Sequence, residues 1–212
     1  MLTDDELRAE LDRLQPFEGR VGWLYQDSAT PPNVTTGVGC LIHDVDAACA
    51  LPFHHLEDGL RATRDEVASD FFRVKAMRGG LMASAYKGPL RLADLDIDAL
   101  GFQRLRGFLG ALPDVFPGYA GFPVPAQQAL LDLAWNVGLG APASASHPAT
   151  GLHAWEQLRA ACNQVPPDWP TAARECRTAN PHGSPAREKR NDWRSSMMVD
   201  AAAGTPTPEP AG

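Results

Sequence analysis

The sequence predicts an α+β fold with a small N-terminal lobe, built from a helix and a β-hairpin, and a larger all-helical C-terminal lobe. Three observations predict it. A capped amphipathic helix opens the chain, residues 23–42 have the composition of short strands and turns, and helical periodicity then continues to about residue 200. We therefore expect one domain over residues 1–200, with lobes over 1–62 and 63–200, and a disordered tail over 201–212.

The N-terminal lobe begins with a predicted helix over residues 4–15. Thr3 and Glu6 form a capping box, leucines follow at i, i+4 and i+7 spacing, and Pro16 is expected to end the helix. The next stretch, WLYQDSATPPNVTTGVGCLI, mixes aromatic and β-branched residues with a Pro-Pro pair and glycines. This composition is typical of a small hairpin or three-stranded sheet.

The C-terminal lobe begins with a second capping box, Thr63 with Glu66, which opens a helix through about Met77. Residues 81–98 show no regular pattern. Apolar periodicity, Pro starts and Gly stops then predict the remaining helices. These are expected near residues 97–113, 125–137, 150–161, 171–178 and 184–202.

The composition excludes several classes of protein and partner. Of 212 residues, 44% are hydrophobic and 21% charged, which excludes disorder for most of the chain. No apolar run reaches the ~18 residues of a membrane span, and the acidic first 25 residues do not resemble a secretory signal. The net charge of −7 argues against nucleic acid or an anionic membrane as a partner.

Neither the cysteines nor the histidines predict a metal site, and no cofactor is expected. Four cysteines without a C-x-x-C spacing are expected to be reduced and mostly buried, with a Cys162–Cys176 bridge as the alternative. The remaining cysteines are Cys40 and Cys49. The residues considered as metal ligands, none with a known metal-binding spacing, are His43, Asp44, Asp46, His54 and His55.

Residues 17–39 contain the candidate catalytic groups. Glu18 stands at the end of the first helix, Asp27 lies nine residues later at the edge of the predicted hairpin, and Thr35 and Thr36 precede Gly-Val-Gly. Two carboxylates on different elements can face one site. Hydrolysis of a glycosidic bond requires one protonated carboxyl group to protonate the leaving oxygen and one carboxylate to activate water or attack carbon.

This pattern resembles the phage-type (T4-like) lysozymes, glycoside hydrolase family 24, whose motif is Glu, eight residues, Asp, then Thr shortly before Gly-x-Gly. Glu18-x8-Asp27 matches in spacing, and TTGVG over residues 35–39 is similar to the strand that bears the family's threonine. AWNVG over residues 134–138 and REKR over residues 187–190 resemble two further family segments. Three features depart from the pattern: a longer interval between Asp27 and the threonines, Cys40 after Gly-Val-Gly, and residues 78–98.

The resemblance covers residues 3–200. It implies a lysozyme-like fold with the active site in a cleft between the lobes, and cleavage of the β-1,4 bond between N-acetylmuramic acid and N-acetylglucosamine in peptidoglycan. Glu18 would be the general acid, Asp27 would hold or activate the water, and Thr35 or Thr36 would position it. The family inverts the anomeric centre, for which the two carboxyl groups stand ~6.5–9.5 Å apart. The substrate-binding residues it implies are Trp135, Asn136, Arg187 and Arg190.

Such an enzyme is a bacteriolytic muramidase that acts on peptidoglycan glycan strands as a monomer. Because the chain has no recognisable signal, we expect synthesis in the cytoplasm and delivery to the cell wall either by holin-dependent release, as for an endolysin, or by a secretion machine, with an immunity protein as a further partner. Two functions remain as alternatives: a lysozyme-like domain that binds cell wall or protein without cutting, and a hydrolase of chitin or chitosan.

Each candidate residue also has a structural interpretation. Glu18 can be a solvated helix-end carboxylate and Asp27 an ordinary turn residue. Trp135 lies inside an apolar helix and can belong to the core, whereas Arg187 and Arg190 can form a solvated basic face. The wider cluster of cations near the end of the chain would give this lobe a local positive charge, opposite an N-terminal half that carries the acidic excess.

Overall fold

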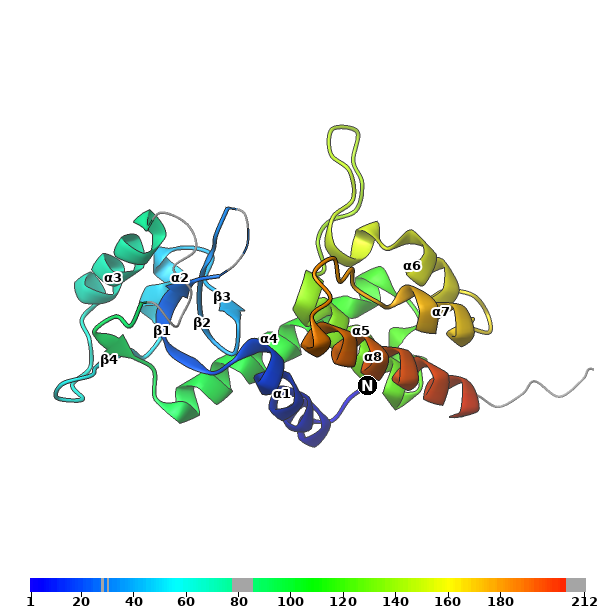
Figure 1. The fold of residues 1–212 in the computed structure, drawn as a ribbon, viewed down its shortest axis with the longest axis horizontal. Helices are drawn as coiled ribbons and strands as arrows, with labels where there is room; N and C mark the ends of the chain where they lie inside the picture. Colours follow the sequence, from blue (N-terminus) through cyan, green and yellow to red (C-terminus); the bar gives the residue numbers. More distant parts are fainter. Residues whose placement is uncertain (28, 30, 78–85, 205–212) are drawn as a thin grey trace, which may run out of the picture. The chain divides into compact units, whose positions relative to one another are not determined.

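The computed structural model describes residues 1–27, 29, 31–77 and 86–204, and it confirms an α+β fold in which helices accompany a small antiparallel sheet (Figure 1). The chain forms two compact units. The first, here the N-terminal unit, is Leu11–Arg104. The second, here the helical unit, joins Met1–Glu10 to the chain from Leu105 onward.

This division differs from the expected boundary between residues 62 and 63. Helix α3 (Arg64–Ala76) packs against strands β1 (Val21–Gln26) and β2 (Val34–Gly37), so it belongs to the N-terminal unit. The buried side chain of Gln26 donates hydrogen bonds to the carbonyl oxygens of Val74 (3.0 Å) and Met77 (2.8 Å). The Val74 carbonyl also accepts from the Met77 amide (3.1 Å), so the Gln26 side chain adds partners for the carbonyl groups at the C-terminal end of α3.

Helix α1 (Asp4–Glu18) begins as expected, because the Thr3 amide donates to Glu6 Oε2 (2.6 Å) and the Glu6 amide to Thr3 Oγ1 (3.3 Å). The expected end at Pro16 is wrong, since the helix includes this proline and continues to Glu18. Only the last turn follows Pro16, so the missing N–H removes a single helical bond. Gly19 then ends the helix with a φ of +76°.

The expected sheet has three antiparallel strands in the order β1, β2 and β3 (Cys40–Leu41). In its register Tyr25 lies opposite Thr35, and Thr36 lies opposite Cys40. Because successive side chains of a strand point to opposite faces, Thr35 and Thr36 project from opposite sides of this sheet.

The rest of the N-terminal unit includes helix α2 (Val45–Ala50) and a second, two-stranded sheet of β4 (His54–His55) and β5 (Leu90–Arg91). The capping box at the start of α3 is confirmed. The sequence pattern missed β5, because two residues are too short to show a period of two. Of the segment without a pattern, residues 81–85 lie outside the described residues.

The helical unit surrounds α5 (Val124–Val137), whose expected proline start and Gly138 end are confirmed. Its side chains from Ala129 to Ala134 are fully buried, and α8 (Pro185–Gly204) packs along it. The other elements are listed here in chain order. They are α4 (Asp94–Val115), which spans both units, and then η1 (Tyr119–Gly121), η2 (Gly151–Ala154), α6 (Glu156–Cys162) and α7 (Trp169–Glu175).

Two expectations for this unit need correction. Thr150 does not begin one long helix through Ala161, because the short helix η2 ends at Ala154 and α6 starts afresh at Glu156. The expected disordered tail begins too early, since α8 continues to Gly204 and buries Ala201 completely. Residues 205–212 lie outside the described residues.

All four cysteines are free thiols, as expected, and Cys162 and Cys176 form no bridge. Burial raises the pKa of Cys162 to about 12 and that of Cys176 to about 11, so both thiols are protonated and unreactive at neutral pH. Within the part of the chain that the structure describes, no helix is both long and apolar enough to cross a membrane.

Candidate active site

Glu18 ends helix α1 and lies directly against the turn between β2 and β3. A Cβ atom on Gly39 would stand 3.0 Å from Glu18 Oε2 and 3.4 Å from Glu18 Cβ. Gly39 also has a φ of +65°, a conformation that L side chains rarely adopt. Glycine is therefore required at position 39 for two reasons, its backbone conformation and the half-buried Glu18 side chain above it.

Asp27 follows β1 and organises the loop to β2. Its Oδ1 accepts hydrogen bonds from the amides of Ala29 (3.0 Å) and Asn33 (2.8 Å), and its Oδ2 accepts one from Asn33 Nδ2 (2.9 Å). The Asp27 amide also donates to the Asn33 carbonyl (3.0 Å). The carboxylate is thus held in one orientation by its own hairpin, as in an Asx turn.

Tyr25 connects the two carboxylates. Burial raises the pKa of its phenol to about 12, and the negative charges of Glu18, Cys40 and Asp27 add to this effect. The charges of Glu18 and Asp27 therefore both disfavour ionisation of the same phenol. The sequence analysis missed Tyr25. Its position near the end of β1, two residues before Asp27, was the available signal.

Thr35 and Thr36 differ in what their hydroxyl groups do. Thr36 is completely buried and its Oγ1 donates to the carbonyl oxygen of Val21 (3.3 Å). Thr35 is 3% exposed, and its Oγ1 has no hydrogen-bond partner among the described residues. A buried hydroxyl group without a partner is uncommon and is explained by an ordered water or a ligand group. Thr35 is therefore the better candidate for holding a water.

Cys40, which departs from the family pattern, is buried behind this site. Its Sγ lies 3.9 Å from the Val38 carbonyl, and burial raises the pKa of the thiol to about 11. Arg104 and the Val38 contact oppose this rise, whereas Glu18 adds to it. The side chain is neutral at physiological pH and contributes packing beside Glu18.

In the helical unit, Arg190 serves the core. It is 5% exposed, and its Nε donates to Asp132 Oδ1 (3.0 Å) and Oδ2 (3.1 Å). Arg194, which is fully buried, donates to the same carboxylate and, through Nη2, to Asn136 Oδ1 (3.1 Å). One buried carboxylate thus binds two buried guanidinium groups. The alternative interpretation of Arg187 and Arg190 as a solvated basic face is wrong for Arg190, which is buried.

The other implied substrate-binding residues have different surroundings. Trp135 is 5% exposed and packs edge-to-face on Phe108, with ring centroids 6.2 Å apart, so its indole is a core group. Asn136 and Arg187 are exposed, and Arg187 donates to the Ala179 carbonyl (2.9 Å). Of this set, Asn136 and Arg187 alone present their side chains to solvent.

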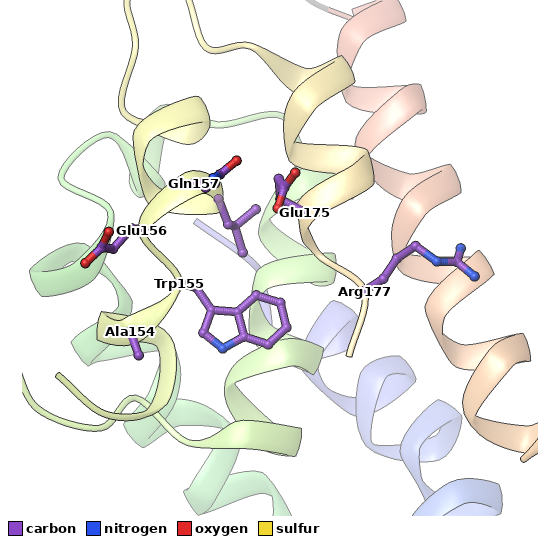
Figure 2. Close-up of a pocket in the computed structure, with 7 residues that line it drawn as sticks. Ala154, Trp155, Glu156, Gln157, Glu175 and Arg177 are labelled. Carbon is purple, nitrogen blue, oxygen red and sulfur yellow. The ribbon is translucent and has the colours of Figure 1, made fainter. Parts of the chain in front are cut away.

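The helical unit has a cavity of about 420 Å³ that the sequence did not indicate (Figure 2). The indole of Trp155, at the junction of η2 and α6, lines it together with Gln157 of α6. Glu175 at the end of α7 and Arg177 complete its polar wall. Arg177 is already paired with Glu188 and Asp192. An aromatic ring beside a few polar groups is typical of small-ligand sites.

No protein-family model and no curated protein matches this chain. In residues 1–27, 29, 31–77 and 86–204, no group of three or more His, Cys, Asp or Glu side chains could hold a metal ion. A function for this protein therefore has to be argued from the arrangement of its own side chains, chiefly those around Glu18.

Proposed function

We propose that this protein is a muramidase, which hydrolyses the β-1,4 bond between N-acetylmuramic acid and N-acetylglucosamine of peptidoglycan. One observation carries the proposal. A half-buried carboxyl group, Glu18, lies directly against Gly39 in the turn between β2 and β3, and the charges of Glu18 and of a second carboxylate, Asp27, both act on the Tyr25 phenol. Two carboxyl groups held by different elements are what glycoside hydrolysis requires.

In this mechanism Glu18 donates a proton to the glycosidic oxygen as the bond to the anomeric carbon breaks. The contact with Gly39 limits the positions of the Glu18 carboxyl group, and a fixed geometry is a large part of what an acid catalyst needs. Asp27, oriented by its three loop hydrogen bonds, accepts the proton of the attacking water. The Thr35 hydroxyl group holds that water.

The helical unit contributes substrate contacts in this proposal. The side-chain oxygen of Asn136 is held by Arg194, which fixes the amide group while its nitrogen keeps two donors for a sugar or peptide carbonyl. Trp155 offers its half-buried indole, which lines the cavity of Figure 2, for a sugar ring. Trp135 and Arg190 receive no ligand contact, because both side chains are buried.

The test compares Glu18→Gln with Glu57→Gln, a matched change at an exposed glutamate on a turn. Reducing ends released from purified peptidoglycan should fall about 10²–10⁴-fold in Glu18→Gln, the usual contribution of a general acid, and stay unchanged in Glu57→Gln. Both variants should keep the wild-type circular dichroism spectrum. Normal turnover by Glu18→Gln would refute the assignment.

One observation favours a second candidate, a lysozyme-like domain that binds cell wall without cutting. The three hydrogen bonds to Asp27 come from its own hairpin loop, which is the pattern of a turn-forming residue. This function predicts that wild type and Glu18→Gln sediment equally with insoluble peptidoglycan and that mass spectrometry detects no muropeptide products from either. A comparison with chitooligosaccharides decides whether the polymer is instead chitin or chitosan.

A further inference from the structure

A long loop projects from the helical unit between α5 and η2. It is the yellow-green loop at the top of Figure 1, and we call residues 140–150 the finger. Residues 140–148 are all exposed, so none of these side chains packs against the body of the protein. The finger contributes nothing to the core, and stability alone gives no reason to keep it.

The base of the finger is a fixed structure. The Thr150 amide donates to the Ala141 carbonyl (3.0 Å), and the Ala141 amide donates to Thr150 Oγ1 (3.0 Å). Below this pair the Leu152 amide donates to the Gly138 carbonyl (3.0 Å). A Cβ on Gly140 would stand only 2.0 Å from the Thr150 carbonyl oxygen, so the two arms meet closely where residue 140 is glycine.

The tip of the finger is also held by hydrogen bonds. The Ser144 amide donates to the His147 carbonyl (2.9 Å), the His147 amide donates to Ser144 Oγ (3.2 Å), and Ser146 Oγ lies 2.8 Å from His147 Nδ1. Pro142 and Pro148 restrict the backbone on either arm. A loop ordered before binding loses less conformational entropy when it meets a partner.

The composition of the finger narrows the partner. No Asp, Glu, Lys or Arg occurs from residue 138 to residue 155, although 21% of the whole chain is charged. Phosphate-rich partners require cations, and protein interfaces depend on aromatic, Arg or other large anchor residues. The finger has no Arg, Lys, Trp, Tyr or Phe, and the His147 imidazole is its one aromatic ring. It otherwise offers alanine methyl groups, serine and threonine hydroxyl groups, two prolines and backbone amides.

We propose that the finger is an attachment surface for the neutral amino-sugar chain of the insoluble polymer, an inference that rests on the proposed function. Small methyl groups fit the C–H faces of sugar rings, and serine and backbone groups exchange hydrogen bonds with hydroxyl and N-acetyl groups. An uncharged contact is also suited to a protein of net charge −7, because peptidoglycan stem peptides carry carboxylates that repel an acidic surface. The descending arm leads through η2 directly to Trp155 in the cavity of Figure 2, which makes the two surfaces continuous along the chain.

The first test shortens the finger. Residues 142–149 are replaced by Asn-Gly, which closes the hydrogen-bonded Ala141–Thr150 pair with a two-residue turn. Loss of even two hydrogen bonds to sugar should weaken sedimentation with insoluble peptidoglycan about 10-fold or more. Turnover of short soluble glycan oligosaccharides should stay within about 2-fold, since the finger contacts the polymer and not the scissile bond.

A second variant keeps the chain length. Ser144→Glu with Ser146→Glu puts two negative charges on the finger and should weaken binding to the polymer, whereas the same charges at Ser69 and Ser196, two exposed serines elsewhere, should not. Unchanged polymer binding by both finger variants, or an equal loss on soluble oligosaccharides, would overturn the inference. The binding measurement in a Glu18→Gln background needs no cleavage. A wild type that binds through the finger without cutting would therefore count against the muramidase assignment and for the attachment surface.

Discussion

The contact between Glu18 and Gly39 gives the sharpest prediction, which is the effect of Gly39→Ala. The new methyl group would stand 3.0 Å from Glu18 Oε2 and 3.4 Å from Glu18 Cβ, closer than ordinary van der Waals contact. Glu18 must therefore move. A displacement of about 1 Å at a reacting group can lower the rate about 10²-fold, and relief of these contacts needs a smaller shift, so we expect a loss below about 10²-fold in reducing-end release from peptidoglycan.

The same substitution also strains the backbone, and a control must separate this effect. A non-glycine residue in the left-handed conformation costs about 1–2 kcal/mol. Gly59 has a φ of +72° and nothing within 4 Å of an added Cβ, so Gly59→Ala carries the backbone strain without touching Glu18. Both variants should lose about 1–2 kcal/mol in urea denaturation, and Gly39→Ala alone should lose activity. Equal activity in the two variants would refute the role of Gly39 in positioning Glu18.

Three further predictions concern other parts of the structure. Asp132→Asn leaves the buried guanidinium groups of Arg190 and Arg194 without a carboxylate, so the free energy of unfolding measured with urea should fall by about 3–5 kcal/mol. A fall of less than about 1 kcal/mol would contradict the proposed pairing. Folding raises the pKa of the Tyr25 phenol from 10.0 to about 12, so the folded state favours the neutral phenol. About 3 kcal/mol of folding stability is therefore present below pH 10 and is lost as the pH rises to 12. Tyr25→Phe should remove this part of the stability loss at alkaline pH. Thr35→Val should lower turnover about 10²-fold, as for removal of one preorganised hydrogen-bonding group, whereas Thr36→Val should cost about 1 kcal/mol of stability and leave turnover unchanged.

Most of the helices could be predicted from the sequence, because their signals are local. Both capping boxes, and the glycine that ends α5, involve residues within four positions of one another, so the sequence shows them directly. Strand β5 left no signal, because its pairing with β4 joins residues that are 35 or more positions apart. The assignment of α3 to the N-terminal unit depends on its packing against the sheet, which has no local trace either.

In the candidate site, too, some features have local sequence signals and others depend on contacts between distant segments. Spacing alone selected Glu18 and Asp27, and it kept Thr35 and Thr36 as equal candidates. The hydrogen bond from Thr36 to Val21, 15 residues away, distinguishes them. Sequence could not show that Arg190 turns inward, because the carboxylate it binds, Asp132, lies 58 residues earlier on another helix. Nor could it show the Trp155 cavity, whose lining residues come from η2, α6, α7 and the segment after α7.

The sequence by itself determined where most of the helices begin, which carboxyl and hydroxyl groups stand at the spacing of the family it resembles, and that the stretch from 138 to 155 contains no Asp, Glu, Lys or Arg. These properties follow from composition and from interactions over a few residues. The tertiary structure decided which residues share surroundings: Glu18 on Gly39, both carboxylates acting on the Tyr25 phenol, and two arginines on one buried aspartate. The physical reason is that burial and partner choice arise between distant segments, and the charge or hydroxyl group left available to a ligand is whatever those contacts do not use.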